Sequence, residues 1–113
     1  MIRNFTPHDV HLATVAGRVR VPPDGPPARI RQRAVPVGRV AVHDTEIELF
    51  DVHDGGVDGL PDPQPGVYLV VPRVVAYACP ERRDLVFPYQ EVRDENGRVI
   101  GCAALGRTLR EGR

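Results

Sequence analysis

The stretch Gly66-Val67-Tyr68-Leu69-Val70-Val71 is a nearly continuous apolar run, which is typical of a short strand buried on both faces. The next segment starts with a proline, which suits a first helical position, and places Val74, Val75 and Ala78 on one helical face. Because Pro80 cannot continue a helix, this segment ends within two turns. The sequence therefore predicts a buried strand followed by one short helix.

Outside this stretch, 12 prolines and 11 glycines divide the chain into short pieces, which favours strands over helices. Alternating apolar residues predict a hairpin of residues 9–15 and 18–21 that reverses at Ala16-Gly17. A second hairpin, with strands at 91–93 and 98–103, would reverse at Asn96-Gly97, a pair that accepts positive φ at both central positions. Further strands are expected at residues 28–33, 35–42, 45–52 and 84–88.

Two segments are expected to lack regular structure. Residues 22–27, which read PPDGPP, predict an exposed turn, and a long Pro-rich loop is expected from Asp54 to Gly66. Together these features predict a mainly β fold: a small twisted β-barrel or sandwich of about six to eight short strands with one short helix. A single domain is expected over residues 1–106, followed by a polar tail at 107–113.

The composition excludes several chemistries. Every one of the 15 basic residues is arginine, and the absence of serine and lysine excludes a serine nucleophile, a Schiff-base lysine and a P-loop lysine. The 15 acidic residues bring the formal net charge to zero, which disfavours binding to a long nucleic acid. Zero net charge also leaves little self-repulsion, which favours self-association.

The location of the protein is predicted from what the sequence lacks. No apolar run approaches the roughly 18–20 residues of a membrane span, and residues 1–7 lack the apolar core of a signal peptide. Cys79 and Cys102 could pair, but two cysteines are too few for the disulfide framework of a small secreted protein. A cytoplasmic protein without a membrane partner is therefore expected.

His8 is the most interesting of the four histidines. It follows Thr6-Pro7, a rigid turn directly before the first convincing strand, and imidazole suits general acid or base catalysis near neutral pH. A surface or turn-capping histidine is the alternative interpretation. The spacing of three between His8 and His11 would place them on opposite faces of a strand. No Cys-x-x-Cys or His-x-x-x-His motif is present, so no metal site is predicted.

The segment Glu81-Arg82-Arg83-Asp84 is the densest charge cluster in the chain. Paired arginines bind phosphate or carboxylate in bidentate fashion, and the carboxylate of Asp84 could fix a guanidinium or orient a histidine. A solvated loop with internal ion pairs is the alternative. Tyr68 and Tyr77 are candidates for stacking on a base, although both would also fit the core or its rim.

Four motifs carry a resemblance: NFTPHDV at residues 4–10, GLPDP at 59–63 with GVYLV at 66–70, RDL at 83–85, and VRDENGRVIGC at 92–102. In combination they are typical of a set of small proteins of phages, plasmids and bacterial defence neighbourhoods. This set resembles a compact family of CRISPR-associated ring nucleases. The resemblance covers nearly the whole chain and is weakest between Pro22 and Val57. Val71-Pro72-Arg73 departs from the pattern, because relatives carry a small polar residue before the helix.

The resemblance implies a homodimer that opens cyclic oligoadenylate second messengers and so switches off type III CRISPR signalling, with mobile-element relatives acting as anti-CRISPRs. It implies a mechanism without metal or cofactor, in which a ribose 2′-hydroxyl attacks the adjacent phosphodiester. The implied roles are general acid or base for His8, phosphate binding for Arg83 with Arg82 or Arg73, orientation for Asp84, hydrogen bonding to ribose or phosphate for Asn4 and Thr6, and ligand binding for Tyr68.

Two other functional classes fit the sequence. The first is a non-enzymatic nucleotide- or protein-binding module, such as a sponge for nucleotide signals or a phage-derived interaction protein. The second is a metal-dependent phosphodiesterase. Binding without turnover would indicate the first class, and loss of activity in EDTA would indicate the second.

Overall fold

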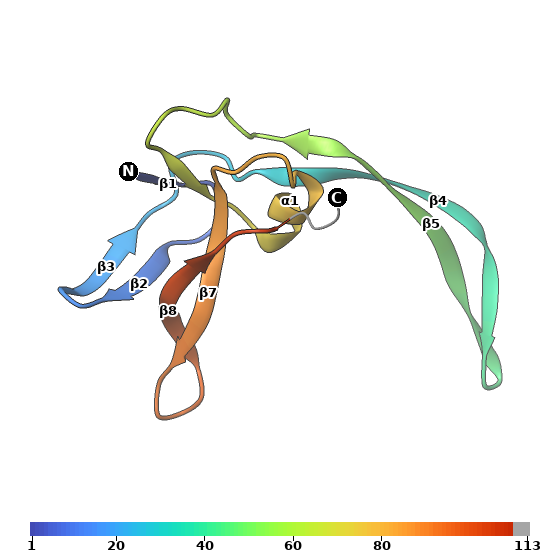
Figure 1. Ribbon diagram of the computed structural model, residues 1–113. Coiled ribbons are helices and arrows are strands. Elements are labelled where there is room, and N and C mark those ends of the chain that lie inside the picture. Colours follow the sequence, from blue (N-terminus) through green and yellow to red (C-terminus); the bar gives the residue numbers. More distant parts are fainter. Residues whose placement is uncertain (110–113) are drawn as a thin grey trace.

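Figure 1 shows a computed structural model of the chain, which describes residues 1–109. The described residues form eight strands and one helix, so the predicted mainly β fold with one short helix is confirmed. In chain order the elements are β1 (Ile2–Asn4), β2 (Val10–Thr14), β3 (Gly17–Val21), β4 (Arg29–Val42), β5 (Thr45–Asp58), β6 (Tyr68–Val70), α1 (Arg73–Ala78), β7 (Leu85–Arg93) and β8 (Val99–Gly106).

Six strands form one sheet in the order β1-β6-β7-β8-β2-β3. The apolar run of the sequence supplies β6, which runs parallel to both of its neighbours, β1 and β7. β8 is antiparallel to β7, and the β2–β3 hairpin joins the other side of β8. The Asn4 side chain bonds the Val21 carbonyl, and the Asp24 N–H bonds the Asn4 carbonyl. These bonds bring β1 toward the end of β3, so the sheet curls into a half-barrel (Figure 1).

Apolar side chains cover both faces of this sheet. On one face, Leu69 and Leu85 pack with Val75 of α1. On the other face, Val70 and Val86 pack with Val10 of β2. Successive residues of a strand point to opposite faces, so a strand buried on both faces needs an uninterrupted apolar sequence. Leu69 and Val70 are almost completely buried, which confirms the predicted buried strand.

β4 and β5 form a separate two-stranded sheet that leaves the rest of the molecule as a long curved ribbon (Figure 1). We call residues 29–58 the arm and the other described residues the body. The strands pair from Arg29 and Asp58 at the base to Val42 and Thr45 at the tip. The radius of gyration is 17.9 Å, whereas a compact chain of this length has about 13 Å. Ile30 and Val57 at the base of the arm pack against the core of the body. Beyond this base the arm is an extension and not a part of that core.

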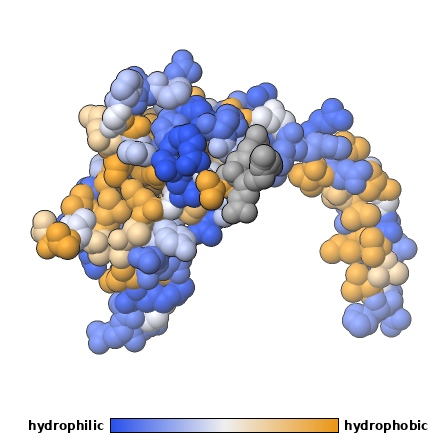
Figure 2. Space-filling view, in the orientation of Figure 1, coloured by the Kyte–Doolittle hydropathy of each residue, from blue (hydrophilic) through white to orange (hydrophobic). Residues whose placement is uncertain are grey.

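Apolar side chains lie on the surface of the arm (Figure 2). Those that are at least 43 % exposed are Val37, Val40, Val42, Ile47, Leu49, Phe50 and Val52. Residues directly opposite each other share a face of a ribbon, and neighbours along a strand alternate. Val40 therefore shares one face with Ile47, and Arg39 shares the other face with Glu48. The outer part of the arm is thus apolar on one face and charged on the other.

The strands of the arm are longer than the sequence predicts. The strands expected at 28–33 and 35–42 are one strand of 14 residues, β4, with an irregularity between Pro36 and Gly38. A β-bulge of this kind lets a strand continue past residues that break its pairing. The loop expected from Asp54 begins only after Asp58, because β5 continues to pair with the base of β4.

The other predicted strands are present, but the position of one turn and the division into strands differ from the prediction. The β2–β3 hairpin is confirmed, but it reverses at Val15-Ala16, since Gly17 already pairs with Thr14. The two strands expected at 84–88 and 91–93 are the single strand β7.

The β7–β8 hairpin is also confirmed, with a different turn geometry. Gly97 has positive φ (80°), but its neighbour Asn96 does not. The Asp94 carboxylate accepts hydrogen bonds from the N–H groups of Asn96 and Arg98, at 2.8 and 3.0 Å. These bonds hold the turn in a conformation that requires a glycine at one position only.

The expected polar tail begins in contact with the body. Arg83 Nη1 donates a hydrogen bond to the Thr108 carbonyl, at 3.0 Å. Residues 110–113 of this tail lie outside the described residues. Between residues 1 and 109, no helix has the length and apolar character needed to cross a membrane.

Candidate functional site

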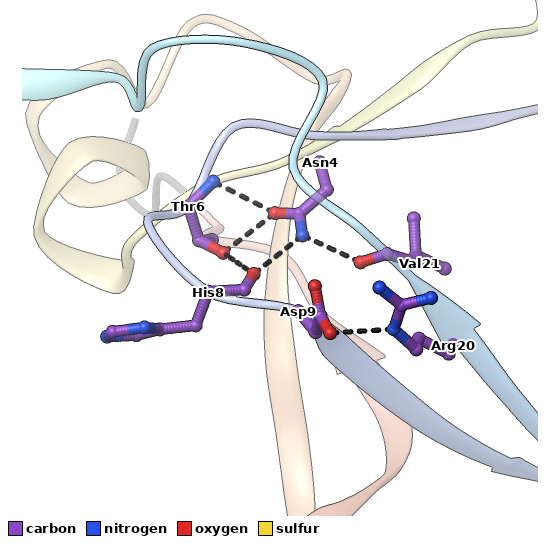
Figure 3. A network of polar contacts seen from close by, with 6 residues as sticks. All are labelled: Asn4, Thr6, His8, Asp9, Arg20 and Val21. Atoms are coloured by element: carbon purple, nitrogen blue, oxygen red, sulfur yellow. Dashed lines mark hydrogen bonds and ion pairs between the residues drawn. The ribbon is translucent and has the colours of Figure 1, made fainter.

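Asn4, at the end of β1, organises the loop that carries His8 (Figure 3). Its side chain is fully buried. Nδ2 donates to the carbonyl oxygens of His8 and Val21, at 2.8 and 2.9 Å. Oδ1 accepts bonds from N and Oγ1 of Thr6, at 2.9 and 2.7 Å. Because every polar atom of the Asn4 amide has an internal partner, Asn4 and Thr6 position the loop and place His8 at the surface.

His8 borders a cleft of about 710 Å³, within the range of pockets that bind small molecules. The residues that line it are Thr6, Pro7, His8, Asp9, Val10, His11, Arg18, Val71, Pro72, Pro88, Glu91, Val99, Ile100, Gly101 and Cys102. Its walls are mostly apolar. Two histidines and one arginine, His8, His11 and Arg18, line this one cleft together.

Gly101 allows β8 to approach β2 closely at this cleft. A Cβ atom at position 101 would lie 2.7 Å from the His11 carbonyl oxygen, a distance that no side chain tolerates without movement of the backbone. Glycine therefore fixes the spacing of the two strands and with it the position of His11 beside the cleft.

The charges of the cleft favour an anionic ligand. Its two carboxylates are paired with arginines, Asp9 with Arg20 at 2.6 Å and Glu91 with Arg93 at 2.8 Å. Arg18 makes no ion pair with any residue in the range 1–109. Its guanidinium is free to bind a phosphate or a carboxylate with two parallel hydrogen bonds.

Arg82 and Asp84 form a separate polar group. Arg82 Nε and Nη2 donate to the two carboxylate oxygens of Asp84, at 2.9 and 2.8 Å, and Nη2 also donates to the Pro61 carbonyl at 2.9 Å. The side chains are only 18 % and 14 % exposed. The hydrogen bonds from Arg82 lower the pKa of Asp84 below its usual value, against the opposing effect of burial. This pair ties the Pro-rich loop to the start of β7.

The other predicted site residues lie elsewhere on the body. Arg83 contacts the start of the C-terminal tail. The Arg73 guanidinium lies over the Phe87 ring, 4.6 Å from its centroid. Tyr68 is exposed, and its backbone N–H donates to the Met1 carbonyl at 2.9 Å. These contacts hold the chain together and bring no phosphate-binding group to His8.

Of the eight predicted site residues, the cleft brings together Thr6 and His8, with Asn4 bonded to both. Arg73, Arg82, Arg83, Asp84 and Tyr68 do not line it. His11 and Arg18 were not among the predicted site residues. The spacing of three predicted opposite strand faces for His8 and His11, but His8 lies in the turn before β2, where strand alternation does not apply.

The two cysteines are free. Burial, reinforced by the nearby Glu81 charge, raises the pKa of the Cys79 thiol, so Cys79 is a weak nucleophile at neutral pH. Across residues 1–109, no group of three or more His, Cys, Asp or Glu side chains is arranged to hold a metal ion.

Comparisons of the chain with protein-family models, with curated proteins and with solved structures gave no match. The resemblance to ring nucleases is therefore carried by the sequence motifs alone and stays a prediction.

Proposed function

We propose that the protein cleaves cyclic oligoadenylate in the His8 cleft, by attack of a ribose 2′-hydroxyl on the adjacent phosphodiester. The observation that carries this proposal is the cleft itself, which unites His8, His11 and Arg18 within about 710 Å³. In this proposal Arg18 binds the phosphate in place of Arg83, the residue that the resemblance implies for this role, because Arg83 does not line the cleft.

The residues of the cleft match the needs of this reaction. One histidine accepts the proton of the 2′-hydroxyl as its oxygen bonds to phosphorus, and the other donates a proton to the departing 5′-oxygen. The products are a 2′,3′-cyclic phosphate and a 5′-hydroxyl, so the reaction consumes no water. Arg18 stabilises the charge that develops on the phosphorane oxygens. The adenine rings would pack on the apolar walls of the cleft.

The proposal includes a cytoplasmic homodimer as the active form. A reducing compartment suits the free thiols of Cys79 and Cys102. Neutral overall charge suits a small anionic ring better than a long polyanion.

The test is incubation of the protein with cyclic tetra- and hexa-adenylate in EDTA, followed by chromatography of the products. Linear products with 2′,3′-cyclic phosphate ends are expected. His8→Ala and His11→Ala should each lower the rate at least about 100-fold, in line with the loss of a general acid or base. His53→Ala, at an exposed position of the arm, is the matched control and should leave the rate unchanged. Intact rings at high protein concentration would refute the nuclease.

A second candidate, a non-enzymatic binding module, is favoured by one observation. The arm exposes seven large apolar side chains, which is typical of a surface that binds a macromolecule. Binding of labelled cyclic tetra-adenylate without any product, or binding of a protein through the arm alone, would favour this candidate over the nuclease.

A further inference from the structure

We infer that the arm of one copy adds to the free edge of β3 in a second copy, so that two chains exchange arms and extend each other's sheet. This inference concerns residues 45–49 of β5 and residues 17–21 of β3. It does not depend on the proposed nuclease activity.

Both strands have an unpaired edge. β3 is the last strand of the six-stranded sheet, and its one partner among the described strands is β2. β5 pairs with β4 alone in the two-stranded sheet of the arm. A free edge presents unpaired N–H and C=O groups that readily accept another strand. Two-stranded ribbons are marginally stable by themselves, so the arm gains stability from a third strand.

The sequences of the two edges are complementary. β3 reads Gly-Arg-Val-Arg-Val over residues 17–21, and the outer part of β5 reads Thr-Glu-Ile-Glu-Leu over residues 45–49. In an antiparallel pair centred on Val19 and Ile47, Arg18 lies opposite Glu48 and Arg20 lies opposite Glu46. Directly opposite residues share a face, so two ion pairs form on one face and apolar contacts on the other.

The four charged side chains have donors and acceptors that are left free for these contacts. Neither Arg18 nor Glu48 takes part in any ion pair within residues 1–109. Asp9 occupies only Nε of Arg20, and Arg39 occupies only Oε1 of Glu46. A guanidinium has five N–H donors, so Arg18 can bind Glu48 along one edge and a phosphate in the cleft along another.

The apolar faces also match. Val19 and Val21 lie opposite Leu12 and Val10 in the β2–β3 hairpin, on the face of the sheet that carries the Val10–Val70–Val86 cluster. Val19 is nevertheless 45 % exposed. An added β5 strand would bring Ile47 and Leu49 onto this face and extend the cluster across the sheet edge.

In the proposed register, residues 17–21 of β3 and residues 45–49 of β5 can pair over the same length and stop pairing at the same points. Pro22 follows Val21 and cannot donate a ladder hydrogen bond, so β3 cannot be extended as a pairing edge. In the antiparallel register Pro22 lies beyond Thr45, where β5 has also ended at the His43-Asp44 turn. At the other end, pairing stops at Leu49, beside the irregularity between Pro36 and Gly38. A parallel register would instead place Pro22 against Phe50 in mid-strand.

A second copy is the occupant that these observations favour. The complementary charges, two arginines and two glutamates, come from the same chain, whose net charge is zero. A stable dimer interface buries about 800 Å² per partner. Exchange of both arms about a two-fold axis forms the same contact twice, so the β3 and β5 edges are paired in both copies and this contact cannot propagate to a third copy.

The experiment measures molar mass by light scattering during size-exclusion chromatography of the full chain. The wild-type protein should elute as a dimer, with twice the monomer mass of 12.5 kDa. Two double variants, Glu46→Arg/Glu48→Arg and Arg18→Glu/Arg20→Glu, should each be monomeric. An equimolar mixture of the two should regain the dimer mass, because both contacts of the mixed dimer then join opposite charges.

The matched control is Glu81→Arg/Glu95→Arg, which makes the same change of net charge at exposed positions outside both strands and should remain dimeric. Regain of the dimer by mixing also proves that both variants are folded. A monomeric wild-type protein, dimers that persist in both double variants, or a mixture that stays monomeric would each overturn the inference. Nuclease assays are not needed for any of these outcomes.

Discussion

The strands of the body and of the arm both carry apolar side chains and bury them very differently. In the body, Leu69 and Leu85 are at most 2 % exposed, whereas Ile47 and Val52 in the arm are 60 % and 56 % exposed. The difference lies in what each strand packs against. The central body strands β6 and β7 have neighbours on both edges, and α1 packs against β7, while the arm contacts the body only at its base, beside α1. Apolar alternation therefore shows that a strand has a face to bury, but not which molecule buries it.

The largest effect is expected from removing a large side chain in the body. Phe87 is 5 % exposed and packs in the cluster with Phe5 and Leu85. Phe87→Ala should lower the free energy of unfolding by about 3–5 kcal/mol, because a buried cavity is left. Phe50→Ala in the arm, where the ring is 44 % exposed, should cost about 1 kcal/mol or less. Urea denaturation of the monomer at low concentration measures both, and equal losses would contradict the contrast between the two regions.

The next largest effect is expected at Asn4. Asn4→Ala removes four hydrogen bonds at a fully buried position. The Val21 carbonyl and the Thr6 N–H lose their bonds to this side chain, and the His8 carbonyl keeps only the bond from Thr6 Oγ1. A loss of about 3 kcal/mol is expected, since buried polar groups without partners are costly. Amide hydrogen exchange in residues 5–10 should also accelerate. Asn96→Ala, on the exposed β7–β8 turn, is the control and should change stability by no more than about 0.5 kcal/mol.

A smaller, pH-dependent effect is expected from the Arg82–Asp84 pair. Because Arg82 lowers the pKa of folded Asp84 below the unfolded value of about 3.9, the pair stabilises the protein above that pH. This contribution is lost as the pH falls through the folded pKa. Asp84→Asn should cost about 2 kcal/mol at pH 7 and markedly less at pH 2–3. Denaturation curves at both pH values test this, and a pH-independent cost would assign the loss to packing.

The smallest effect is expected from an isosteric change in the arm. Val52→Thr should change the free energy of unfolding of the monomer by no more than about 0.5 kcal/mol, because water already reaches this side chain. The same change in the body, Val70→Thr, buries a hydroxyl and should cost about 1–3 kcal/mol. Thermal unfolding of the two variants gives the comparison directly. A large cost at Val52 would show that the monomer itself packs against the arm.

The predictability of the fold differs between local and long-range features. The strand containing Leu69 and Val70 and the short helix after it were predictable, because an apolar run and two prolines act over a few residues. The length of β4 was not, since a bulge at Pro36 is tolerated only where β5 holds the strand in place. Likewise, Gly55 and Gly56 lie in an irregularity of β5, and the pairs on either side of it, Gln32–Asp54 and Ile30–Val57, keep these residues within the strand although both favour a loop.

The candidate site shows the same division. The motif that contains His8 pointed to a turn before a strand, and His8 does lie there. The cluster at residues 82–84 was expected to join it, but Arg82 and Asp84 bind each other at the start of β7. Nothing in the sequence separates an arginine that holds a phosphate from one that holds a nearby carboxylate. Arg18 and His11 reach the cleft because β2, β3 and β8 pair there, which is a property of the whole sheet.

The sequence by itself determined the class of the fold, the buried strand at residues 68–70, both short hairpins and the absence of serine and lysine chemistry. These follow from residue types and spacings that act locally. Only the tertiary structure decided that the second quarter of the chain leaves the body as an arm, and that His8 shares a cleft with His11 and Arg18. Both depend on which strand edges meet, and strand alternation specifies the faces of a strand but not its neighbours.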